Sequence, residues 1–343
     1  MTSADNATAW GHPERHYAAS SAAAPRPAER SGADIGRVWQ KALEAAAPGS
    51  RDLVERTFKQ WNTILRDYLR TETALRLTVG EDAQSIPVRI VDGMPRRFAE
   101  ALQQFEDLAP MLLQRPALEA AASGTAFMEK HIHAVRGEGG VTVGPSDANE
   151  IQRVNQTARA WLAMLDEAQV VDRITGIDED VLGAYFFRVP EIRLYWVVIG
   201  ITARSLGVPT EALTIVVLAH ELAHAYTHLG RDIDNERWDT ERLAAADLHI
   251  VEGLAQFYTH VICTRLEQRM PAALTAFNAL LDKQSDIYKA HCAWTTPNER
   301  GGEIIRVSMI ECRSRGVTEL AIFAEAVERH RNGVRGRRSP GAS

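Results

Sequence analysis

Two histidines and a glutamate stand at a spacing that suits metal chemistry. His220, Glu221 and His224 form the pattern H-E-x-x-H. On a helix, residues four apart lie on the same face, so both imidazoles can bind one Zn²⁺ at about 2.1 Å. Glu221 is adjacent to His220, and its carboxylate can reach a water molecule beside that metal. The pattern therefore predicts two metal ligands and a general base within one turn of helix.

The segment around this pattern is more hydrophobic than a surface helix. Residues 213–219 read Leu-Thr-Ile-Val-Val-Leu-Ala, between Pro209 as a helix start and Gly230 as a helix stop. Histidine and glutamate side chains inside such a helix need a buried partner, because burying an unpartnered polar group is costly. The bare pattern can also arise by chance, but a metal ion is the simplest partner in this setting.

A third ligand is expected, because a catalytic zinc usually has three protein ligands and one open position. His228 lies on the same helical stripe, but it is eight residues from His220. That separation is about 12 Å along a regular helix, so one ion cannot bind both side chains. Glu252 is the better candidate, since it stands among apolar residues of the next predicted helix, beside Gly253. The alternative to a buried ligand is that Glu252 lies on the solvent-exposed polar face of that helix.

These segments resemble a known family. The run H-E-L-A-H-A-Y-T at 220–227, followed by E-G-L-A at 252–255, is similar to the gluzincin group of zincin metallopeptidases, and locally to its thermolysin type. The resemblance covers roughly residues 180–265. It implies an α+β zincin-like catalytic domain that acts on a peptide or protein substrate. It also implies the roles of four residues, with His220, His224 and Glu252 as ligands of Zn²⁺ and Glu221 as the catalytic base.

Two departures from the thermolysin type concern residues that orient the ligands. His228 stands where that type has an aspartate, and Gln256 stands where it has another. The orientation of the ligand histidines must therefore come from other groups. The candidates are backbone carbonyls and the side chains of Asp232, Asp234 and Asp247.

The resembled family also uses a histidine or tyrosine downstream of the ligands to stabilise the oxyanion of the reaction. The candidates for this role are His260, Tyr288 and His291, and each of them is also compatible with a purely structural role. Arg306 and Arg313 are candidates for binding a substrate carboxylate, although arginines are more often surface residues without such a role.

Two short β-strands are predicted just before the metal helix, at 183–187 and 191–196. An exposed edge of their sheet beside the metal can hold an extended peptide by main-chain hydrogen bonds. The alternative is that these strands only contribute to the core. A second hairpin is predicted between 75–79 and 88–91.

The predicted fold class is mainly α with a small β-sheet. Four parts follow from composition and periodicity: a disordered leader at 1–33, a helical N-terminal domain at 34–145, the zincin-like metallopeptidase domain at 146–330, and a basic disordered tail at 331–343. The N-terminal domain has no metal-ligand or nucleophile spacing. It is therefore predicted to serve in packing or in binding a protein partner.

The composition of the 343 residues, 45% apolar and 24% charged, is ordinary for a soluble globular protein. A net charge of −6 argues against nucleic acid as a partner, and no apolar stretch is long enough to span a membrane. The three cysteines have no C-x-x-C spacing and favour a reducing compartment. The sequence thus predicts a cytoplasmic zinc metallopeptidase. The alternative is a regulatory or non-catalytic zincin-like protein that binds or cleaves one specific partner.

Overall fold

The computed structural model describes residues 32–77, 86–135, 144–169, 172–173, 181–296 and 300–336. The elements before the helix with the H-E-x-x-H pattern are α2 (Gly32–Ala46), α3 (Ser50–Thr73), β1 (Val88–Val91), α4 (Arg96–Gln103), η1 (Glu106–Leu108), α5 (Ala109–Leu113), α6 (Arg115–Val135), α7 (Pro145–Glu167), β2 (Gly183–Phe186), β3 (Glu191–Tyr195) and α9 (Trp196–Leu206). That helix and the elements after it are α10 (Thr210–Leu229), α11 (Thr240–Ala244), α12 (Leu248–Arg265), α13 (Pro271–Lys283), α14 (Asp286–Lys289), η2 (Ala290–Ala293), α15 (Gly301–Arg315) and α16 (Leu320–Gly336). The predicted class, mainly α with a small β-sheet, is confirmed.

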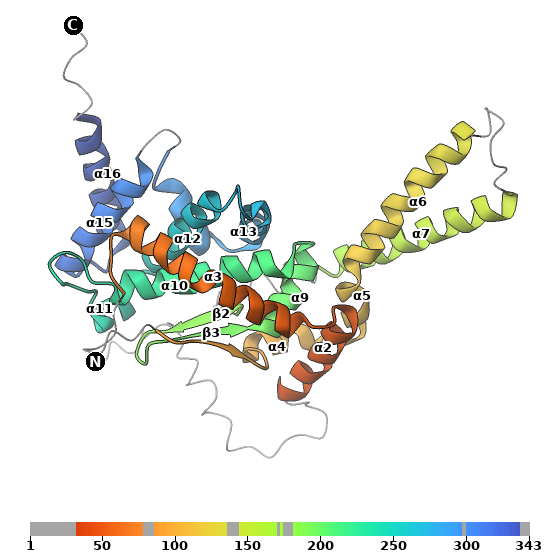
Figure 1. Ribbon diagram of the computed structural model, residues 1–343, viewed down its shortest axis with the longest axis horizontal. Coiled ribbons are helices and arrows are strands. Elements are labelled where there is room, and N and C mark those ends of the chain that lie inside the picture. The colour runs from red at the N-terminus through yellow and green to blue at the C-terminus, as the bar shows by residue number, and fades with distance from the viewer. Residues whose placement is uncertain are drawn as a thin grey trace, which may run out of the picture.

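The helix α10 is the centre of the body. It begins after Pro209 and ends at Gly230, as predicted, and every residue from Ala212 to Leu229 is buried. It is covered by α3, α9, α12 and α13 and by strand β2. A helix that is apolar all round is stable only when other elements surround it. The hydrophobic run predicted from the sequence is therefore explained by this central position (Figure 1).

The sheet has three strands in the order β1-β3-β2. β2 pairs with β3 in the antiparallel sense, with Tyr185 opposite Ile192. β1 pairs with β3 in parallel, with Ile90 opposite Leu194. The predicted hairpin between 75–79 and 88–91 is wrong in its pairing, because Arg76 forms its bridge with Arg231 and β1 takes β3 as its partner. Residues 78–79 of that prediction lie outside the described residues.

One hydrophobic core joins both halves of the chain. Trp39 and Leu65 from the first helices and Trp196 and Ile250 from the later ones belong to the same buried cluster. The helix α3 packs directly on α10. The predicted N-terminal domain thus shares its core with the predicted catalytic domain, and the predicted boundary at residue 145 lies between the paired helices α6 and α7.

The helices α6 and α7 form an arm that projects from the body (Figure 1). At the two ends of the chain, the predicted leader lies outside the described residues except for Gly32 and Ala33, which begin α2. The predicted disordered tail is helical as far as Gly336. Arg331 in this last helix donates from Nη2 to the carbonyl of Trp294 at 2.6 Å, and this bond ties the helix to the body. Within the described ranges, no helix combines the length and apolar character that crossing a membrane requires.

Candidate metal centre

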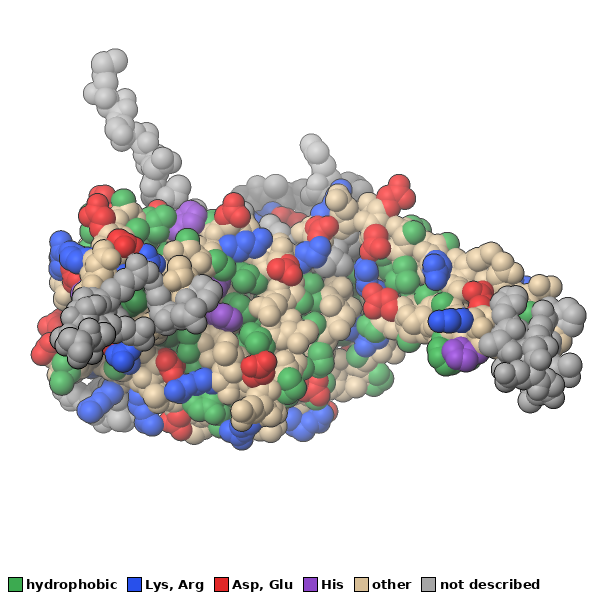
Figure 2. Space-filling model, turned by 90° about the horizontal axis from the view of Figure 1, so that it is seen from above, with side chains coloured by type: hydrophobic (Ala, Val, Ile, Leu, Met, Phe, Trp, Pro, Cys, Tyr) green, Lys and Arg blue, Asp and Glu red, His purple; other side chains and the backbone are tan. Residues whose placement is uncertain are grey.

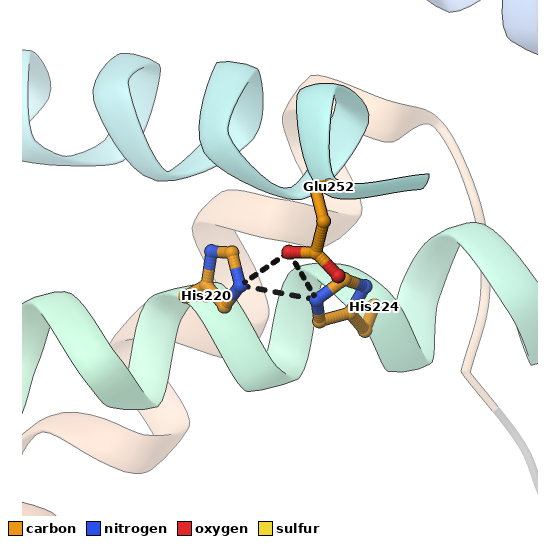
Figure 3. A group of neighbouring side chains, drawn as sticks. All are labelled: His220, His224 and Glu252. Atoms are coloured by element: carbon orange, nitrogen blue, oxygen red, sulfur yellow. Dashed lines mark hydrogen bonds and ion pairs between the residues drawn. The ribbon is translucent and has the colours of Figure 1, made fainter. Parts of the chain in front are cut away.

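Three side chains from two helices converge in the body of the protein (Figure 3). The Nε2 atoms of His220 and His224 are 3.0 Å apart. Oε2 of Glu252 lies 3.2 Å from Nε2 of His220 and 3.4 Å from Nε2 of His224. All three residues are buried, with exposed fractions of 8%, 4% and 5%. The structure therefore brings together the two histidines of the motif and the glutamate that was predicted to join them.

The local sequence explains how the two helices hold these side chains. On α10 the four-residue spacing of His220 and His224 places both imidazoles on the face toward α12. The helix α12 begins at an Asp247 cap, whose carboxylate accepts a hydrogen bond from the backbone N–H of His249 at 2.9 Å. Glu252 follows in the early part of this capped helix, which fixes where its carboxylate points.

Gly253, the residue after Glu252, permits the close approach of an aromatic ring. A Cβ atom at this position would lie 2.7 Å from Cζ2 of Trp294. The Trp294 ring packs in turn on Phe323, with ring centroids 4.9 Å apart. The glutamate side of the cluster is thus held against the body by an indole ring that fills the space left by the glycine.

The pKa values of His220 and Glu252 are shifted in the direction that a metal site needs. Burial lowers the pKa of His220, and repulsion from His224 adds to this effect. The pKa of the Glu252 carboxyl is lowered although burial opposes this, because the charge of His224 and hydrogen bonds from both histidines favour the carboxylate. Neutral imidazoles and an ionised carboxylate are the forms that bind a metal.

The distances also fit zinc. In a tetrahedral shell with metal–ligand distances of about 2.1 Å, neighbouring ligand atoms lie about 3.4 Å apart. The separations in the cluster run from 3.0 to 3.4 Å. Two imidazole nitrogens and one carboxylate oxygen are ligand types of catalytic zinc sites, which leave a fourth position open. The residues present therefore fit a zinc ion held by three protein ligands.

Glu221 lies at the meeting of α10 and the edge strand β2. A Cβ atom on Gly183 would lie 2.7 Å from Oε1 of Glu221 and 2.9 Å from Cγ1 of Val217. Only a glycine lets the strand backbone come so close to this carboxylate. Gly183 was not among the residues predicted for the site. A glycine inside a predicted strand was the signal that could have found it.

The three candidates for stabilising an oxyanion lie at different depths. The ring of Tyr288 is nearest to the cluster, with its centroid 6.3 Å from that of His220. His291 lies beside Tyr288, with its Nδ1 3.0 Å from the carbonyl oxygen of Tyr288. Burial lowers the pKa of His291 to about 4. His260 is exposed, and its ring stacks on Phe277.

His228, which stands where the thermolysin type has an aspartate, has partners on other elements. The ring nitrogens of His228 lie 2.9 Å from the hydroxyl of Tyr185 and 3.2 Å from Oγ1 of Thr240. Both of its ring nitrogens are thus engaged. Burial lowers the pKa of His228 to about 3, and Arg237 and Arg313 add to this effect.

The predicted aspartates also act elsewhere. Oδ1 of Asp232 accepts hydrogen bonds from the backbone N–H groups of Asp234 and Glu236, and Asp247 caps α12. Arg313, a candidate for binding substrate, is buried and donates to the carbonyl of Glu236 at 2.5 Å. Asp232 and Arg313 thus hold the loop between α10 and α11 in place.

Arg306, the other arginine considered for the substrate, lies half-buried on α15.

Comparisons of the chain with protein-family models, with curated proteins and with solved structures found no match. The likeness to gluzincins therefore rests on the sequence motifs alone.

Proposed function

We propose that the protein is a zinc-dependent metallopeptidase that hydrolyses peptide bonds. The observation that carries the proposal is the buried convergence of His220 Nε2, His224 Nε2 and Glu252 Oε2 within 3.4 Å of one another, beside Glu221. When bound there, zinc lowers the pKa of a water molecule to about 7 and polarises the carbonyl of a peptide. A structural zinc site has no need of the neighbouring Glu221 and is usually closed by four protein ligands.

Glu221 is the general base in this proposal. Its carboxylate takes a proton from the attacking water and passes it to the leaving amine. The backbone of Gly183 packs against the carboxylate and restricts its movement. Tyr288 donates a hydrogen bond to the oxyanion that forms at the substrate carbonyl. His291 supports this tyrosine because its Nδ1 contacts the backbone carbonyl of Tyr288.

The edge strand β2 supports a polypeptide as the substrate. β2 is an outer strand of the sheet, and Gly183 at its start lies against Glu221. An extended peptide added along this edge gains main-chain hydrogen bonds while its scissile bond lies near the base. We further infer a reducing, cytoplasmic location, which the free thiols of Cys263, Cys292 and Cys312 support.

The test combines zinc analysis with cleavage of a diverse peptide library. We expect Glu221→Gln to keep its zinc and to lose about 10²- to 10⁴-fold in rate, the usual contribution of a general base. We expect Glu252→Ala to lose most of its zinc, because two histidines alone form an incomplete site. Glu211→Gln, on the first turn of the same helix, is the matched control and should keep both zinc and activity. A Glu221→Gln variant that cleaves at the wild-type rate would exclude the mechanism.

A second candidate function is a zincin-like protein that binds or cleaves one specific partner. The burial of the site favours it, since His220, Glu221 and His224 are at most 8% exposed. A partner that opens the site would then be required for turnover. If the zinc-loaded wild type cleaves no peptide of the library, this second function is preferred over general peptidase activity.

A further inference from the structure

The arm formed by α6 and α7 has a fixed register. Nδ2 of Asn155 donates to Oε2 of Glu129 at 3.2 Å across the two helices. Nearer the body, Nη1 of Arg115 pairs with Oδ1 of Asp166 at 2.9 Å. Because the helices run antiparallel, residues whose numbers sum to about the same value lie at the same level of the arm. Met128 is therefore level with Val154, and Ala121 is level with Trp161.

One side of this arm is predominantly apolar; among the described residues Glu150 near the tip is an exception, and it pairs with Arg153. At 100° per residue, Ala117, Ala121 and Met128 fall within about 40° of one another on α6. Val154 and Trp161 share the corresponding side of α7 and, in an antiparallel pair, the same face of the arm. Met128 is 52% exposed and Val154 is 40% exposed. We call these five residues the apolar face.

The opposite side of the arm is mainly polar, with one exposed aromatic residue, Phe127, whose ring stacks on that of His131. Lys130 and Ser123 on α6 and Gln156 on α7 point away from the apolar face by the same helical geometry, and all three are exposed. Hydrophobic side chains also reach the surface of the arm in the view of Figure 2. A solvated two-helix hairpin needs only one apolar seam, between its own helices. A second apolar face is unexplained by the fold of one chain.

We propose that the apolar face packs against the same face of a second copy of this chain, so that two arms form an antiparallel four-helix bundle. A two-fold axis parallel to the arms brings α6 of one copy opposite α7 of the other. Each Trp161 then lies over the small Ala117 and Ala121 of the second copy, and each Met128 lies against Val154. Large residues meet small ones at the same level, which is the self-complementarity that a two-fold interface requires.

The area of the face agrees with a dimer. Helices of 21 and 23 residues are about 31 to 35 Å long, and two of them side by side are about 20 Å wide. Each copy can thus bury about 600 Å², which gives about 1,200 Å² in total, at the lower limit for stable specific interfaces. The dimer is therefore expected to dissociate on dilution.

The first experiment measures the mass of the full chain by sedimentation equilibrium as a function of concentration. We expect twice the mass of one chain at about 10 µM and above, the range for a small interface. Met128→Glu with Val154→Glu should leave a monomer. Ser123→Glu with Gln156→Glu adds the same charge to the polar side and should leave the dimer intact. A wild-type monomer at about 100 µM, or a dimer that survives the first pair of changes, overturns the proposal.

The second experiment tests the two-fold geometry by disulfide cross-linking in a Cys292→Ser background, since Cys292 is the exposed native thiol. Chains with Met128→Cys are mixed with chains carrying Val154→Cys. We expect a cross-linked dimer in the mixture that is much less abundant with either chain alone, because a disulfide needs Cα atoms within about 7 Å. A mixture of Ser123→Cys and Gln156→Cys chains should not cross-link. Equal cross-linking of both mixtures overturns the arrangement.

Discussion

The centre around α10 and the arm of α6 and α7 invert the usual placement of residues in opposite ways. In the centre, the polar groups of His220, Glu221 and Glu252 are buried in an apolar body. On the arm, the large apolar residues Phe127 and Met128 are 62% and 52% exposed. A buried polar group and an exposed apolar patch are the informative departures from the general pattern of burial. On the proposals above, a metal ion accounts for the buried polar groups and contact with a second copy accounts for Met128, whereas Phe127 lies outside that contact and stacks on His131.

The two regions also differ in how closely neighbouring atoms surround each residue. The glycines show this difference, because the space that an added Cβ atom would occupy is filled in the centre and open on the arm. Around Gly183 and Gly253 in the centre that space is filled by other side chains, whereas no atom lies within 4 Å of it at Gly124 on the arm. Changes in the centre should therefore alter activity and stability strongly, and matching changes on the arm should not.

Among the changes that test this comparison, the largest effect is expected from Gly183→Ala. The added Cβ atom would lie 2.7 Å from Oε1 of Glu221, so either the base or the strand must move. A displacement of about 1 Å at a catalytic group can reduce the rate by about 10²-fold, and we expect a loss of that order with the zinc content unchanged. Steady-state peptide hydrolysis and metal analysis measure the two quantities. Gly36→Ala is the matched control, since its Cβ atom would meet only Met94 at 3.8 Å.

If Gly183→Ala cleaves peptides as fast as Gly36→Ala, the close packing of strand and base has no role in catalysis. A simultaneous loss of zinc would instead indicate that the strand supports the ligands.

The next effect is on stability, from Gly253→Ala. The new methyl group would overlap the Trp294 ring, and overpacking of this kind typically costs about 1 to 3 kcal/mol. Because Glu252 is the adjacent residue, we also expect weaker zinc binding. Urea unfolding of the metal-free protein measures the first effect, and competition with a chelator measures the second. An unchanged unfolding midpoint would mean that the indole ring moves aside freely.

A further effect on stability depends on pH and concerns His228. Its pKa is about 3 in the folded protein, against about 6.5 in an unfolded chain. Below pH 6.5 the unfolded state therefore binds a proton that the folded state does not, and stability falls as the pH falls. The slope from this residue approaches about 1.4 kcal/mol per pH unit until the pH nears 3.

The measurement is the free energy of unfolding of the wild type and of His228→Gln between pH 7 and pH 4. Both chains keep the same metal ligands, so the contribution of those ligands cancels in the difference. We expect the advantage of the wild type to shrink as the pH decreases. Parallel curves would show that the imidazole takes up its proton without loss of the folded state.

The centre was more predictable from the sequence than its surroundings. Pro209, Gly230 and the four-residue histidine spacing are local signals, and they defined α10 and two side chains of the cluster. The burial of Glu252 was predicted from its apolar neighbours, which is also a local signal. The partners of His228 were not predictable, because Tyr185 and Thr240 reach it from other elements.

The parallel pairing of β1 with β3 has the same explanation. About 100 residues separate the two strands, and the arm lies between them in the sequence. A local pattern of apolar residues identifies a strand but not its distant partner. Helical periodicity identifies helices, but it does not reveal that α6 and α7 project from the body as a pair.

The smallest expected effect comes from Gly124→Ala on the arm. No atom lies within 4 Å of the added Cβ atom, so the change should act only through helix propensity. Replacing a helical glycine by alanine typically stabilises a protein by about 0.5 to 1 kcal/mol, the opposite sign to Gly253→Ala. Thermal unfolding at one fixed chain concentration measures it, since dimerisation would also raise the midpoint with concentration. Because Gly124 lies within about 40° of Ala117 and Met128 on α6, it borders the proposed dimer contact, so the fixed concentration is one at which the chain is monomeric. Destabilisation by Gly124→Ala under that condition would mean that this side of α6 packs against its own chain, and the contrast between the open arm and the closely packed centre would then have to be abandoned.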